Sequence, residues 1–256
     1  MTFSQLIASP WFVAALFFIT AYAYSSVGLG GGSTYTALLA VLGFNSLAIP
    51  MISLVLNLIV TSVGSFNFIK SGHGRLGLVL PFLVSSIPMA YLGGTLQLPR
   101  KVFYWALLLS LIFVAVRLYI WKNTSFSLIL GARQKLAVSL VVGAVLGLVA
   151  GIVGIGGGIY LVPLIIILGL GTTKEAAACG AIFIWLNSLS GLAARLQYNA
   201  IDLREYLPLI FAVFLGGVLG SFIGAGRYSP QTMERVLGVV VIVAIVLLFR
   251  KVLTGL

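Results

Sequence analysis

Two glycine-rich segments hold the residues of this chain that could bind a small ligand. The first glycine segment is residues 28–33, Gly-Leu-Gly-Gly-Gly-Ser, and the second is residues 154–158, Gly-Ile-Gly-Gly-Gly. Each precedes a short apolar run, residues 35–43 and 159–170. A helix that begins at such a segment leaves its first N–H groups without an intrahelical acceptor, and its dipole favours an anion. Close packing between helices is the alternative role for such glycines. We expect an anion to contact Gly30, Gly31, Gly32, Ser33, Gly156, Gly157 and Gly158.

Three polar side chains inside apolar stretches could complete such a site. Asn57 and Asn187 lie at matched places in the two halves of the chain, where the alternative role is a hydrogen bond between helices. Arg195 has no acidic residue three or four positions away, and its alternative role is to extend toward the membrane surface. We therefore add Asn57, Asn187 and Arg195 to the expected binding residues.

The acidic residues and the metal-binding types argue against other chemistries. The four Asp and Glu residues fall in connections or at the ends of apolar stretches, so a carboxylate for cation binding or proton relay is missing from the membrane. One His and one Cys give little material for acid–base catalysis or a metal site. We therefore expect neither an enzyme nor a bound metal or cofactor, and an anionic substrate fits better than a cation.

The composition places these residues in a membrane. Apolar residues make up 61% of the 256 residues and charged residues only 7%. The net charge of +11 comes from cations in short connections, which indicates membrane topology rather than nucleic-acid binding. Eight apolar stretches are long enough to cross a bilayer as helices, and none shows the period-two alternation of a barrel. These stretches are residues 11–29, 46–69, 77–97, 102–121, 136–154, 176–198, 206–225 and 232–249.

The order of these features repeats, which predicts two related membrane halves. Residues 1–121 form the first half, residues 122–135 a polar and basic linker, and residues 136–256 the second half. If the two short runs are re-entrant half-helices, the protein has eight spans and both halves have one orientation. If both short runs cross, there are ten spans and two inverted halves of five.

The chain resembles the sulfite exporter TauE/SafE family of membrane permeases. The resemblance covers about residues 10–252 and rests on the paired Gly-x-Gly-Gly-Gly motifs, on Pro163 after the second motif, and on the two halves. The first half departs from the pattern, because Ala37 stands where the second half has Pro163. The resemblance implies movement of sulfite, sulfonates or related anions, commonly as export.

From these features we expect a multi-pass protein of a bacterial-type inner membrane that transports a small oxyanion by alternating access. Sulfite or a small organosulfonate is the expected substrate, and the two half-helix N-termini form its site. A passive anion channel and a non-transporting membrane partner subunit are the alternatives. The coupling ion, if there is one, and the oligomeric state stay open at this point.

Overall fold

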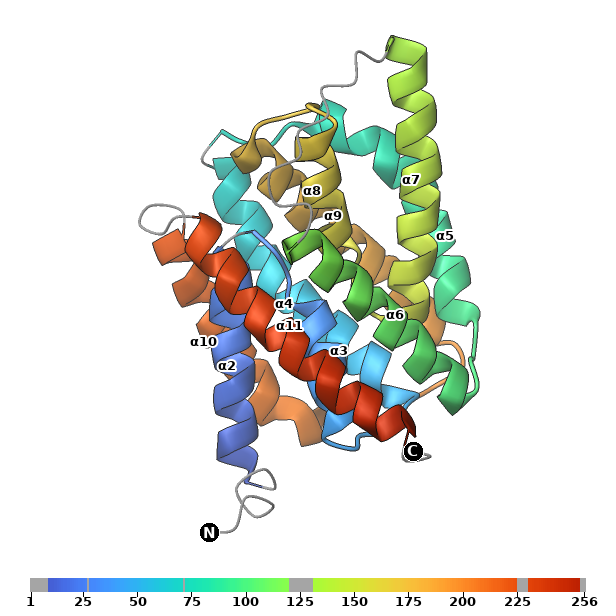
Figure 1. The fold of residues 1–256 in the computed structure, drawn as a ribbon, viewed down its shortest axis with the longest axis vertical. Coiled ribbons are helices and arrows are strands. Elements are labelled where there is room, and N and C mark those ends of the chain that lie inside the picture. The colour runs from blue at the N-terminus through green and yellow to red at the C-terminus, as the bar shows by residue number, and fades with distance from the viewer. Residues whose placement is uncertain (1–8, 27, 71, 120–130, 225–229, 254–256) are drawn as a thin grey trace.

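The fold is a bundle of helices in a computed structural model, which describes residues 9–26, 28–70, 72–119, 131–224 and 230–253 (Figure 1). Within these residues there is no β-strand. The first half contains α2 (Pro10–Ser26), α3 (Gly32–Val41), α4 (Ala48–Lys70), α5 (Leu76–Thr95) and α6 (Arg100–Tyr119). The second contains α7 (Ala132–Val153), α8 (Gly158–Ile167), α9 (Thr173–Arg195), the 3-10 helix η1 (Leu203–Tyr206), α10 (Leu207–Gly224) and α11 (Pro230–Leu253).

The helices confirm the all-helical membrane fold. Each of the eight long apolar stretches contains one helix, and the two short runs form α3 and α8, with ten residues each. Within the described part of the chain, five helices are long and apolar enough to cross a bilayer, and α2 is a shorter apolar helix. The total number of spans stays a prediction. So does the linker, which is described only from residue 131 and contains the beginning of α7.

Glycines let two pairs of helices pack with their backbones in contact. A Cβ atom at Gly143 or Gly147 of α7 would overlap the carbonyl oxygens of Phe82 or Ser86 in α5. Gly216 and Gly220 of α10 contact the backbone of α2 in the same way, at Phe18 and Tyr22. Small residues at such interfaces permit the close approach on which helix association in lipid depends.

The order of these contacts gives the direction of each helix. Residue numbers rise together along α5 and α7, and also along α2 and α10, so each pair is parallel. α4 and α9 are antiparallel, because Leu54 would lie 3.5 Å from a Cβ atom at Gly191, whereas Ser62 accepts a hydrogen bond from Trp185 (2.9 Å). In Figure 1, α2 begins beside the N-terminus at the lower end of the view, and α7 begins at the upper end.

The two short helices return the chain toward the side from which it came. α4 runs parallel to α10, as the contacts Val60–Gly217 and Asn67–Ser221 show, and α10 runs parallel to α2. Because α2 and α4 point the same way, the segment that contains α3 must carry the chain back between them. α8 has the same position between α7 and α9, since both run parallel to α5.

The last helix, α11, contacts the first short helix, α3. The Nζ atom of Lys251, in α11, donates a hydrogen bond to the carbonyl oxygen of Ala40 near the end of α3 (2.6 Å). The same Nζ lies 5.7 Å from the centre of the Tyr104 ring in α6. A cation at this place satisfies a terminal carbonyl and complements the helix dipole.

Candidate functional site

The two glycine segments are tight turns between a long helix and a short one. Gly31 is the N-cap of α3 with φ 88°, and Gly157 is the N-cap of α8 with φ 79°. Gly28, Gly154 and Gly156 also have φ values between 76° and 80°. Residues with a Cβ rarely adopt this conformation, so glycine is required for the turns. Both segments therefore begin a short helix, as the sequence predicts.

The segments lie against each other in the protein interior. A Cβ atom at Gly32 would lie 2.5 Å from the carbonyl oxygen of Ile155, which is in the other segment. Asn57 lies between them, because its Nδ2 atom donates to that carbonyl oxygen (3.1 Å) and also contacts Gly32. Asn57 is fully buried and near the middle of α4. The two turns thus meet beside the middle of α4.

In the first turns of the two short helices, buried residues have N–H groups that donate no hydrogen bond to the described residues. They belong to Gly32 and Ser33 in α3 and to Gly158 and Ile159 in α8. The next N–H groups along the chain, those of Thr34 and Tyr160, donate to the carbonyl oxygens of Gly31 and Gly157. Buried N–H groups are normally paired, and aligned ones at a helix N-terminus favour an anion.

Two side-chain oxygens beside the segments also have no partner within the described residues. Asn57 Oδ1 lies 2.6 Å from a Cβ position at Gly30, and Ser188 Oγ lies 3.0 Å from one at Gly156. Both residues are fully buried. An unpaired polar atom in a protein interior costs free energy, so such atoms indicate a place for a bound polar group.

Ser188 and Ile184 belong to the site, although the sequence did not mark them as binding residues. Ile184 contacts Gly30, Gly156 and Gly158, so it occupies at the second segment the position that Asn57 occupies at the first. The sequence spacing indicates this position, because the number of residues from the second segment to Ile184 is nearly the number from the first segment to Asn57. An isoleucine inside an apolar stretch gave no chemical reason to choose it.

Asn187 is buried but is not among the nearest neighbours of the glycines. Its Nδ2 atom donates to the carbonyl oxygen of Phe183 in its own helix (2.8 Å), and its Oδ1 has no partner in the described structure. The atoms closest to Gly156 and Gly158 belong to other residues. The structure therefore brings Asn57 into contact with both segments and leaves Asn187 about one helical turn further along α9.

Arg195 binds the end of α7. It is only 4% exposed, and its Nη2 atom donates to the carbonyl oxygens of Gly151 (2.8 Å) and Ile152 (2.7 Å). These are among the terminal carbonyls that lack an intrahelical donor. Arg195 thus fixes the helix end directly before the second glycine segment, and its side chain is not extended to the surface. A direct contact with substrate stays a prediction.

Hydroxyl groups surround the first turn of α3. The hydroxyls of Ser33 and Thr34 share hydrogen bonds with the Tyr24 hydroxyl, at 3.0 and 2.8 Å. The Tyr35 hydroxyl is buried against Gly31 and has no partner among the described residues. The sequence included Ser33 in the site, and the structure adds Tyr35 to its edge.

The site is built from neutral polar groups. The segments and their neighbours contribute N–H groups, amides and hydroxyls, and Arg195 is held by two carbonyls. Within the described residues, no group of three or more His, Cys, Asp or Glu side chains could hold a metal ion. An arrangement of N–H donors suits an oxyanion, whose oxygens accept several hydrogen bonds.

Comparisons with known proteins agree with a transport role. Residues 13–248 match the family model described as sulfite exporter TauE/SafE. A probable membrane transporter protein of Sinorhizobium fredii, y4hK, is 34% identical over 91% of this chain and 95% of its own length. The probable membrane transporter protein YjnA of Bacillus subtilis is 23% identical over 94% of this chain and 97% of its own length. No solved structure matches the chain.

Proposed function

Since the chain belongs to the sulfite exporter TauE/SafE family of membrane transporters, we propose that its substrate is a small oxyanion, sulfite or a small organosulfonate. Export is the proposed direction, because an inside-negative potential favours outward movement of an anion. The protein is an integral, multi-pass membrane transporter, and its bacterial relatives fit a location in the plasma membrane.

One observation carries this proposal. The N-termini of α3 and α8 meet in the interior, where N–H groups of both segments donate to no described residue, beside the unpaired oxygens of Asn57 and Ser188. Opposed half-helix N-termini are a known way for transporters to bind an anionic group near the bilayer midplane. The proposed ligands are the N–H groups of Gly30, Gly31, Gly32, Ser33, Gly156, Gly157 and Gly158, with side chains of Asn57, Asn187 and Arg195 around them.

The proposed transport mechanism is alternating access between two inverted halves, residues 1–121 and 136–256. The opposite directions of α2 and α7, and of α4 and α9, support an inverted arrangement of five helices in each half. Rocking of one half against the other would open the central site to each side in turn. The positive φ values of the glycine turns provide backbone freedom at the contact.

The first test is flux of radiolabelled sulfite in proteoliposomes, with and without an imposed membrane potential. We expect saturable flux with counterflow, competition by sulfite analogues such as methanesulfonate, and weaker competition by acetate. Flux without saturation or counterflow would instead indicate a passive anion channel. If folded protein moves none of these anions, the proposed substrate class is wrong.

A pair of alanine substitutions tests the site itself. Gly32→Ala places a methyl group against the Asn57 amide and the Ile155 carbonyl, and we expect flux to fall at least about tenfold. Gly64→Ala in α4 is the matched control, because a Cβ atom there has no neighbour within 4 Å. Equal flux in the two variants would contradict the assignment of the site to the glycine segments.

A further inference from the structure

A second polar site lies at the beginning of α5 and α7, away from the glycine segments. A pocket of about 500 Å³ opens there between the two helices. Its lining combines two cations with apolar side chains and consists of Arg75, Gly77, Leu78, Pro81, Lys135, Leu136, Ser139 and Leu170. Ser139 and the second glycine segment are at opposite ends of α7, roughly 22 Å apart along the helix. The pocket therefore does not belong to the transport site.

The pocket lies on the N-terminal side of the contact between α5 and α7 at Gly143. Gly143 holds the backbone of α7 against Phe82 of α5, and Ser139 lies one turn before Gly143. Toward the helix beginnings, Gly77 of α5 has no atom within 4 Å of its Cβ position. The pocket between α5 and α7 is therefore closed at Gly143 and open toward the beginnings of the two helices.

The polar groups of the pocket suit an anion. Lys135 and Ser139 are four residues apart and so lie on one face of α7. Ser139 is only 5% exposed, and it lines the pocket. Arg75, the N-cap residue of α5, lines the same pocket and also pairs with Glu175 (3.2 Å). A serine hydroxyl that lines one pocket together with two cations is a place where a phosphate oxygen would be bound by several donors.

The apolar lining and the position of the pocket identify the source of that phosphate. The outward faces of α5 and α7 carry exposed apolar side chains from here down, beginning with Leu76, Leu80 and Leu136. The pocket thus lies where the hydrocarbon region meets the headgroup layer. We propose that it binds the phosphate group of an anionic phospholipid, with the lipid chains against the α5–α7 face. A free phosphate ion would not use the apolar lining.

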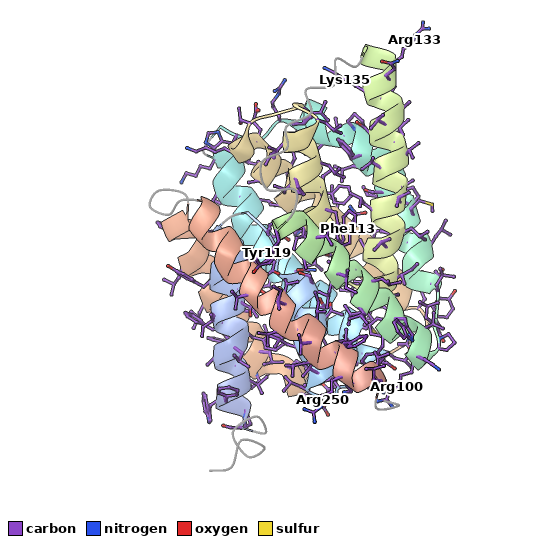
Figure 2. All side chains as sticks on the ribbon, viewed as in Figure 1. Arg100, Phe113, Tyr119, Arg133, Lys135 and Arg250 are labelled. Carbon is purple, nitrogen blue, oxygen red and sulfur yellow. The ribbon has the colours of Figure 1, made fainter. Side chains whose placement is uncertain are left out.

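The chain offers a matched control for the charge. Arg133 and Lys135 are both exposed cations at the upper end of α7 in Figure 2. Two residues along a helix correspond to about 200° of rotation, so they lie on opposite faces. Lys135 lines the pocket and Arg133 does not. Bulk attraction of anionic lipid would be reduced equally by loss of either cation, whereas a defined site depends on Lys135.

Native mass spectrometry of the detergent-purified full chain, titrated with phosphatidylglycerol, tests this site. We expect phosphatidylglycerol to bind more tightly than phosphatidylcholine, Lys135→Gln to weaken it about fivefold, and Arg133→Gln to leave it unchanged. Ser139→Leu keeps both charges and fills the pocket, so it should remove the tightly bound lipid. Gly77→Leu should do the same from α5, and it replaces Ser139→Leu if that variant does not elute as folded protein.

Three results would overturn the proposal. Equal losses for Lys135→Gln and Arg133→Gln would mean unspecific attraction to the surface. Undiminished binding in folded Gly77→Leu would place the lipid elsewhere. Displacement of the lipid by an equal concentration of inorganic phosphate would identify a free-anion site.

Discussion

At the scale of single residues, Asn57 is the side chain that joins the two glycine segments. Its amide nitrogen binds the Ile155 carbonyl, and this bond fixes the orientation of the amide with Oδ1 toward Gly30. The corresponding position beside the second segment is occupied by Ile184. The first segment therefore has a polar side chain at this position and the second an apolar one, although the backbone turns of the two segments are alike.

This difference predicts unequal effects of two alanine substitutions. Asn57→Ala removes the bond to Ile155 and leaves a buried carbonyl unpaired, so we expect sulfite flux to fall about tenfold. Asn187→Ala removes a bond within one helix and should reduce flux less than Asn57→Ala does. Proteoliposome flux and melting temperature of both variants check this prediction. Equal losses would show that the two amides act as an equivalent pair.

Arg195 provides a second prediction at this scale. Arg195→Met leaves the Gly151 and Ile152 carbonyls without their donor, so the free energy of unfolding should fall by about 2 kcal/mol. A lower melting temperature is the expected observation, with Arg204→Met, an exposed arginine, as the control. A higher KM for sulfite at an unchanged melting temperature would instead assign Arg195 to substrate binding.

At the scale of helices, the fold depends on glycines at two parallel interfaces. Gly143 and Gly147 hold α7 against α5, and Gly216 and Gly220 hold α10 against α2. Each faces a backbone carbonyl rather than the end of a flexible side chain, so a methyl group cannot be accommodated by a rotamer change. The helices would have to move apart along the whole interface.

We therefore expect Gly147→Ala and Gly220→Ala to destabilise the protein by about 1–3 kcal/mol each. Gly77→Ala in α5 is the control, because its Cβ position is open and alanine favours a helix. Thermal unfolding in detergent measures the difference. Unchanged melting temperatures of both interface variants would contradict the close packing.

The elements were more predictable than their contacts. Apolar stretches of membrane length, together with the glycine motifs, predicted the long helices of the described residues and both short ones. Lipid requires helices, and glycines with positive φ form the turns before α3 and α8. The partner of each helix depends on which faces fit together, and a single sequence does not record this. For the same reason the sequence identified Asn57 but paired it with Asn187, whereas packing places Ile184 and Ser188 beside the second segment.

At the scale of the whole molecule, the directions of the helices test the arrangement of the halves. The loops after α3 and after α8 should lie on opposite sides of the membrane if the halves are inverted. Asn45 is exposed in the loop after α3, and Lys174 is exposed in the first turn of α9, directly after the other loop. Each can be replaced by Cys in a Cys179→Ser background. A membrane-impermeant maleimide should label Asn45→Cys from one side and Lys174→Cys from the other. Labelling of both from one side would contradict the inverted arrangement.

The contact between Lys251 and Ala40 has a consequence for the synthesis of the protein. The helices on both sides of the first glycine segment contact groups that leave the ribosome last, because Lys251 of α11 binds the end of α3 and α10 packs on α2. A nascent chain that ends after the first half has the turn at Gly31 but not the helices that surround it. The binding centre therefore forms only after translation of the final helix, and truncated chains should insert into the membrane without becoming active.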